Sequence, residues 1–167
     1  YYVADCKYNA NSSLIIPSLY NGKPVTNIGN YAFMGCASLT SITIPNSVTN
    51  IGNDAFRSCS SITTVTIPNN VTSIGEGTFA DCSSLISVTI GNSVTSIGRL
   101  AFYRCFSIDT IHVEATTPPT VDVEAFLSTS ISTCYIPCGT LATYQASDWA
   151  NYVGEFVEEC EEGRQII

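Results

Sequence analysis

The sequence predicts a right-handed solenoid of stacked coils, with a parallel six-stranded sheet on one face and short extended pieces and helical turns on the other. Four segments that begin at Val25, Val48, Val71 and Val94 align without gaps. The phenylalanines, glycines and cysteines of these segments each recur at a step of 23 residues. A coil of this length cannot bury its apolar positions alone, so it must stack on its neighbours.

The main strand of each coil is predicted from the second copy. Val65 and Ile67 are two residues apart and therefore share one face of a strand, while the threonines beside them face outward. Together with Ile62 they have the spacing of a leucine-rich repeat strand. Pro68 ends the strand, because proline cannot donate a hydrogen bond to a sheet ladder.

The rest of the second copy supplies the other side of the coil. Residues 48–51 are predicted to form a second, short extended piece. Gly52 is expected to make the corner, because glycine tolerates backbone conformations that other residues avoid. Residues 53–59 are predicted to form a helical turn that directs Phe56 inward.

Both ends of the array depart from the repeat. Near the N-terminus residues 14–17 imitate a main strand, and a turn-rich insertion at 20–24 lengthens this coil. Near the C-terminus Phe126 follows Phe102 by 24 residues, with Pro118 and Pro119 in the longer connection. Strand spacing then returns at Ile131, Cys134 and Ile136, which makes six strands in all.

The last part of the chain is predicted to cap the solenoid. Residues 140–149 are expected to form a short helix that lays Leu141, Tyr144 and Trp149 over the last coil. The glutamates at 155, 158, 159, 161 and 162 are expected to be a solvated exit or linker. The predicted units are an N-terminal capping coil at 1–24, four repeats at 25–117, a degenerate fifth repeat with a cap at 118–153, and an acidic tail at 154–167.

Composition narrows the class of protein. The chain has 167 residues, of which 45% are hydrophobic and 12% charged, which is typical of a folded domain. Its formal charge of -8 argues against a nucleic-acid partner, since that requires a basic patch. No apolar run is long enough to span a membrane. Because the chain starts at Tyr1 without an apolar leader, we expect it to be a piece of a longer protein.

The eight cysteines fall into two groups. Four recur in register, and parallel side chains about 4.8 Å apart do not converge as a disulfide requires, so we expect buried free thiols. These are Cys36, Cys59, Cys82 and Cys105. Cys134 occupies an inward strand position and is expected to be buried as well. A disulfide between Cys138 and Cys160, or between Cys6 and a partner outside the chain, remains open.

Chemistry-bearing patterns are sparse. Cys134 and Cys138 lack a second pair of metal ligands, so no metal site is predicted. His112 could act as a base oriented by Asp109, but residues three apart on a strand lie on opposite faces. No nucleophile elbow, phosphate loop or dinucleotide fingerprint occurs. We therefore expect that the protein has no catalytic residues and no cofactor, and that it is not an enzyme.

The outward positions of the main strands are the candidate ligand-binding site. Because threonine is a good strand former, these positions could equally serve only to stabilise the ladder. If the face does bind a partner, Tyr135, His112 and the nearby Tyr103 are the expected anchors, since aromatic side chains carry much of the energy of interfaces. The candidate positions are Ser41, Thr43, Thr64, Thr66, Ser87, Thr89, Thr110, His112, Thr133 and Tyr135.

The repeat, V-x-x-I-G-x-x-A-F-x-x-C-x-S-L-x-x-I-x-I-P, resembles the BspA-like, or Treponema pallidum-type, leucine-rich repeat over roughly residues 12–153. The sequence departs from the unit at Gly91, His112, Glu114 and Thr129. The resemblance implies an exported or surface-displayed, non-enzymatic protein used in adhesion or host contact. It carries over no catalytic or ligand-binding residues.

Two functions follow from this reading. The first is a monomeric interaction module, extracellular or on the cell surface, that binds a protein or glycan of a host or neighbouring cell through the sheet face. The second is a structural spacer that holds another domain away from the cell envelope and has no ligand of its own. A hydrolase would need paired outward carboxylates, and none is predicted.

Overall fold

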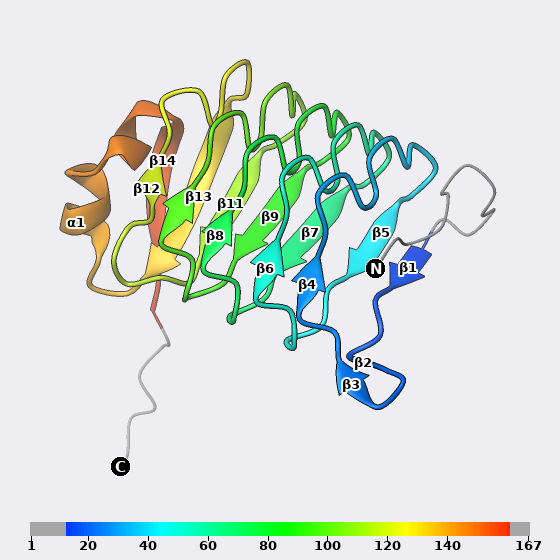
Figure 1. The fold of residues 1–167 in the computed structure, drawn as a ribbon. Coiled ribbons are helices and arrows are strands. Elements are labelled where there is room, and N and C mark those ends of the chain that lie inside the picture. The colour runs from blue at the N-terminus through cyan, green and yellow to red at the C-terminus, as the bar shows by residue number, and fades with distance from the viewer. Residues whose placement is uncertain (1–12, 161–167) are drawn as a thin grey trace, which may run out of the picture.

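The protein, described here by a computed structural model for residues 13–160, is a solenoid in which two parallel sheets face each other across the core (Figure 1). Its main sheet has seven strands in the order β1-β5-β7-β9-β11-β13-β14. These strands are β1 (Ser13–Ile15), β5 (Ser41–Thr43), β7 (Thr64–Ile67), β9 (Ser87–Ile90), β11 (Thr110–Val113), β13 (Ile131–Pro137) and β14 (Val153–Glu159). The solenoid and its parallel sheet were predicted and are confirmed.

The opposite side of the first five coils carries a two-residue strand. These short strands form a five-stranded sheet in the order β12-β10-β8-β6-β4. They are β4 (Asn27–Ile28), β6 (Asn50–Ile51), β8 (Ser73–Ile74), β10 (Ser96–Ile97) and β12 (Thr120–Val121). Both sheets pair successive coils at the predicted step, as Thr64 with Ser87 in the main sheet and Ile51 with Ile74 in the short one.

A column of phenylalanines runs through the core. The rings of Phe33, Phe56, Phe79, Phe102 and Phe126 stack with centroids 5.1–5.5 Å apart and planes within 10° of parallel. All five side chains are almost completely buried. The predicted inward positions of the second copy are buried too, from Val48 to Ile67. The core is therefore continuous along the axis of the solenoid.

The segment around each phenylalanine differs from the predicted helical turn. Phe56 N donates to Thr78 O of the next coil, whereas Arg57 N donates back to Asp54 O within its own turn. Asp54 and Ser58 have positive φ values of 52° and 60°, which a helix does not allow. Amides therefore alternate between their own coil and the next one, and the turns form a third ladder along the solenoid.

Gly52 is required for a different reason from the one predicted. Its φ is not positive, but a Cβ there would lie 2.5 Å from Asn30 N and 2.8 Å from Gly29 C of the preceding coil. The equivalent Gly29 begins the array and meets no described atom within 4 Å. Close approach of neighbouring backbones, rather than conformational freedom, explains the repeated glycine.

Three of the four cysteines in register are buried free thiols, as predicted. Each donates to the carbonyl of the phenylalanine 26 residues earlier, for example Cys59 Sγ to Phe33 O at 3.1 Å. Burial raises the pKa of Cys59 and of Cys105 to about 12, so both stay protonated and can donate. Thr129 replaces the thiol in the last coil and donates to Phe102 O at 2.6 Å.

The prediction of a free thiol is wrong at Cys36, which is disulfide-bonded. The geometric objection to bonds within the column still holds, because Cys59, Cys82 and Cys105 are free. Cys36 belongs to the first coil of the array, where no thiol of an earlier coil in the column stands below it. Cys6 lies outside the described residues.

The N-terminal departure from the repeat has the predicted form. Leu14 of β1 pairs with Ile42 of β5, which places residues 13–15 as the first main strand. The insertion that follows is an antiparallel hairpin of β2 (Leu19–Tyr20) and β3 (Lys23–Pro24). Asn21 and Gly22 connect its strands with positive φ, which suits a tight hairpin turn.

A short helical segment covers the last coil, as predicted. It consists of α1 (Leu141–Gln145) and the 3-10 helix η1 (Asp148–Asn151). Tyr144 and Trp149 are fully buried, and Leu141 is partly buried against the core. Tyr144 Oη donates to Ala115 O and Trp149 Nε1 to Pro119 O, so both aromatic residues bury their rings without leaving polar atoms unpaired.

The predicted acidic exit is wrong for its described part. Residues Val153–Glu159 form a seventh strand, β14, parallel to β13, with Phe156 beside Cys134. Glu158 accepts a hydrogen bond from Leu141 N at the start of α1. Cys138 and Cys160 form a disulfide that closes the whole cap. Glu161 and Glu162 lie outside the described residues.

Replacing Phe79 by alanine should lower the free energy of unfolding by about 3–5 kcal/mol, because the cavity falls in the middle of the aromatic column. Urea unfolding followed by circular dichroism measures this. The matched variant Phe106→Ala removes a ring that is 60% exposed and should change stability by less than about 1 kcal/mol. A loss below about 1 kcal/mol at Phe79 would contradict its place in the core.

The glycine argument predicts different effects at two equivalent positions. Gly52→Ala should destabilise the protein by about 1–3 kcal/mol, because its Cβ meets backbone that cannot move aside. Gly29→Ala should be neutral or stabilise by up to about 1 kcal/mol, because it restricts the unfolded chain and meets no described atom. Equal effects of the two changes in urea unfolding would contradict the explanation by close approach.

Replacing Cys138 and Cys160 by serine should destabilise the protein by about 3 kcal/mol, since the disulfide closes a loop with a sequence separation of 22. The loss should be local to the cap. Hydrogen exchange is expected to speed up in β14 and α1 while β7 and β9 keep their protection. Faster exchange in all strands alike would show that the disulfide supports the whole solenoid instead.

Candidate binding face

The structure places the ten predicted site residues on the outer face of the main sheet, in two columns. One column runs Ser41, Thr64, Ser87, Thr110 and Thr133, and the other runs Thr43, Thr66, Thr89, His112 and Tyr135. All ten side chains are exposed or half-buried. Their spacing is set by strand pairing, because alternate residues of each strand are held in the core.

Both columns extend beyond the predicted residues. At the N-terminal end Ser13 and Ile15 of β1 pair with Ser41 and Thr43. At the C-terminal end Glu155 pairs with Thr133, and Val157 with Tyr135. A signal for β14 was present in the sequence. The spacing of Val153, Phe156 and Glu158 matches that of Ile131, Cys134 and Ile136, with glutamate in the last apolar position.

The hydroxyl groups of the two columns differ in their hydrogen bonds. In the first column Thr110 Oγ1 donates to Ser87 Oγ at 3.0 Å, and Thr133 Oγ1 donates to Glu155 Oε1 at 3.1 Å. Within the described residues, no hydrogen bond engages the hydroxyl groups of Thr43, Thr66 or Thr89. These three groups are therefore available to a partner.

An aromatic pair interrupts the second column. His112 and Tyr135 stack with ring centroids 4.5 Å apart and planes 11° from parallel. Glu159 reaches over β13, and its Oε1 lies 3.2 Å from His112 Nδ1. The histidine is only partly exposed, and its contacts hold it on the outer face. Asp109 lies just before β11, and among the described residues no ion pair or hydrogen bond joins its side chain to His112.

Tyr103 does not belong to this face. It lies in the turn after Phe102, and the guanidinium of Arg104 lies 5.9 Å from its ring centroid and 5.5 Å from that of Phe106. Its closeness to His112 in sequence does not show which side of the coil its ring lies on. The expected set of anchors on the sheet is thus reduced to His112 and Tyr135.

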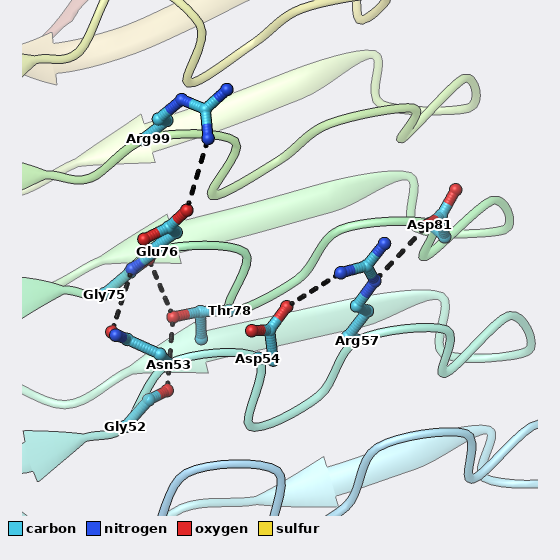
Figure 2. Close-up of polar contacts among 9 residues, drawn as sticks. All are labelled: Gly52, Asn53, Asp54, Arg57, Gly75, Glu76, Thr78, Asp81 and Arg99. Carbon is cyan, nitrogen blue, oxygen red and sulfur yellow. Dashed lines mark hydrogen bonds and ion pairs between the residues drawn. The ribbon is translucent and has the colours of Figure 1, made fainter.

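The turn side of the solenoid carries charged residues that link successive coils (Figure 2). Arg57 joins Asp54 of its own coil to Asp81 of the next, at 3.3 and 3.7 Å. Arg99 likewise joins Glu76 to Glu124. Asn53 Oδ1 accepts from Glu76 N, and Thr78 Oγ1 donates to Gly75 O. The carboxylates here serve the stacking of coils.

One group of possible metal ligands occurs in the described part of the chain. The ligand atoms of Cys138, Glu158 and Cys160 lie within 4.8 Å of one another. The two sulfurs are joined to each other, and a thiolate is what a metal binds. Glu158 is engaged with Leu141 N. With the disulfide formed, these three residues hold the cap together and leave no thiolate to bind a metal.

Comparisons with known proteins give the family. The model of the BspA type leucine rich repeat region matches residues 26–147 in six copies. The chain belongs to the BspA-type leucine-rich repeat family. This family uses a repeat fold that is typically non-enzymatic and associated with protein interaction. No curated protein sequence matches the chain.

Two solved structures of leucine-rich repeat proteins share this fold. The leucine-rich repeat protein of T. pallidum is 28% identical, with a TM-score of 0.69 over 77% of this chain. A leucine-rich cell surface protein of Faecalibacterium prausnitzii A2-165 is 27% identical, with a TM-score of 0.66 over 87% of this chain. The chain spans 60% of the first protein and 35% of the second.

Within residues 13–160, no helix is both long and apolar enough to cross a lipid bilayer.

Proposed function

We propose that this BspA-type chain is a non-enzymatic interaction module, extracellular or on the cell surface, that binds a protein or glycan through the outer face of its main sheet. The observation that carries the proposal is the second column of that face. Thr43, Thr66 and Thr89 present unengaged hydroxyl groups at a regular spacing, and the aromatic pair of His112 and Tyr135 follows them.

Rigidity supports this role. The backbone behind the columns is held by strand pairing and by the stacked phenylalanines. Binding a partner would therefore cost little conformational entropy on this face. The aromatic pair supplies area at low entropic cost, because its rings already stack. A repeat array of this kind offers an extended surface rather than a single pocket.

The cysteines support a location outside the cell. Cys138 and Cys160 are exposed and disulfide-bonded, and Cys36 is also in a disulfide. Such bonds persist in oxidising compartments and are rare in the cytosol. The likeness to a cell surface protein of F. prausnitzii agrees with this location.

A spacer is the second candidate function. The unbroken column of phenylalanines and the covered last coil favour it, since they make the solenoid stiff without any ligand. A spacer does not use its sheet face for binding, whereas an interaction module does. Substitutions confined to that face therefore separate the two functions.

The test uses two charged double variants. The protein is first screened on a glycan array and against purified extracellular proteins. Thr66→Arg with Thr89→Arg should weaken binding to any confirmed ligand by at least about tenfold, because two long cationic side chains then cover the face. The matched control, Ser73→Arg with Ser96→Arg, places the same charges on the short sheet and should change the affinity less than about twofold.

Both variants should keep the circular dichroism spectrum of the parent protein, since all four positions are at least partly exposed. Equal affinity of the parent and the Thr66→Arg, Thr89→Arg variant for a confirmed ligand would contradict the proposal. Failure of the screen to find any ligand would favour the spacer.

A further inference from the structure

The charges of the described residues are distributed unevenly between the two sides of the solenoid. Arg57, Arg99 and Arg104 all lie in turns, and each is ion-paired with a carboxylate there. Lys23 lies on the exposed hairpin. Over residues 13–160 the outer face of the main sheet therefore carries no lysine or arginine at all. Its acidic residues are left without a cationic side chain of this kind.

Those acidic residues gather at the C-terminal end of the sheet. Asp109 and Glu114 flank β11, and Glu155 and Glu159 point outward from β14; all four are exposed. Glu155 accepts a hydrogen bond from the Thr133 hydroxyl, and Glu159 lies beside His112. No arginine or lysine of the described chain comes within ion-pair distance of them. We refer to these four residues as the acidic end.

The aromatic pair of His112 and Tyr135 lies among the residues of the acidic end. His112 is on the strand that Asp109 and Glu114 flank, and Tyr135 pairs with Val157, between Glu155 and Glu159 on β14. The earlier coils have threonine at the positions of these rings, in Thr66 and Thr89. The two features that break the repeat on this face, rings and carboxylates, therefore occur together at one end.

We propose that the acidic end binds a basic segment of a partner protein, with arginine side chains against Glu155 and Glu159 and beside the Tyr135 ring. The inference rests on the proposed function and names the chemistry of its partner. Arginine fits best, because its planar group pairs with carboxylates in two-pronged hydrogen bonds and also packs against aromatic rings. The neutral hydroxyl columns would then hold the adjoining polar part of the same partner.

The charge arrangement also explains why a cation, rather than an anion, is expected. Acidic side chains that share one end of a sheet repel one another, and a partner's cations would relieve this repulsion. On the turn side the protein's own arginines already do so, as Arg57 does between Asp54 and Asp81. On the sheet face no lysine or arginine of residues 13–160 fills that role, and His112 contacts Glu159 alone among the four carboxylates.

The probe is a labelled, unstructured peptide in which arginine alternates with glycine. Two control peptides carry serine or glutamate in place of arginine. Fluorescence anisotropy at low and at physiological salt measures the affinities. The arginine peptide should bind at least about tenfold more tightly than the serine peptide, and the glutamate peptide should not bind. The preference should shrink as salt rises.

Matched variants locate the site. Glu155→Gln with Glu159→Gln should weaken the arginine peptide at least about tenfold, as expected when two close charge pairs are lost. Glu76→Gln with Asp148→Asn removes the same charge from the turn side and the cap and should change affinity less than about twofold. His112→Thr with Tyr135→Thr restores the residue of the earlier coils and should weaken binding while the fold is kept.

Equal weakening by the two charge variants would overturn the inference, because attraction to the net charge of the chain would then explain binding. Equal affinity for the arginine and serine peptides would overturn it as well. Neither result affects the proposed function, which is tested by substitutions at Thr66 and Thr89 and by a different set of ligands. Loss of binding only in the acidic-end variants would support the inference.

Discussion

The core, the turns and both parallel sheets of this protein depend on successive coils following the same path at the same spacing. The phenylalanine rings stack within 5.1–5.5 Å only because their backbones are in register. The same closeness leaves no room for a Cβ at Gly52, and it brings the Cys59 thiol to the Phe33 carbonyl. Strand pairs, turn amides and side-chain hydrogen bonds all join one coil to the next, so each coil is stabilised chiefly by its neighbours.

Much of this architecture could be predicted because the regular spacing of the repeat shows which residues occupy equivalent positions in successive coils. A constant step identifies equivalent positions, and alternation within a strand then separates inward from outward side chains. Where the repeat ends, this information is lost. The acidic composition after Val153 conceals a strand spacing in which Val153 and Phe156 are the apolar positions. The repeat also predicts that Cys36 resembles the other cysteines of its column, although it stands at the start of that column and is disulfide-bonded. The conformation of the turns could not be predicted either, because the alternation of positive and negative φ values leaves no pattern in the spacing of apolar residues.

The binding face follows from the same geometry but is less determined by sequence. Strand alternation placed all ten candidate residues correctly on the outside, because the core requires the residues between them. It could not show that β14 adds Glu155 and Val157 to the columns, or that Glu159 reaches back to His112. The strand pairs of Glu155 and Val157 join residues 22 apart in sequence, and the contact of Glu159 with His112 joins residues 47 apart. All three depend on β14, which the repeat does not predict. The distinctive chemistry of the face is thus located at its irregular end.

Native-state hydrogen exchange, measured residue by residue along the chain, tests mutual support between coils most directly. If neighbours stabilise one another, backbone amides of β7 and β9 should exchange only through global unfolding, and protection should decline toward the hairpin of β2 and β3. A separate opening free energy for each coil, with β7 and β9 opening well below the global free energy of unfolding, would show that single coils are stable units and would contradict the account.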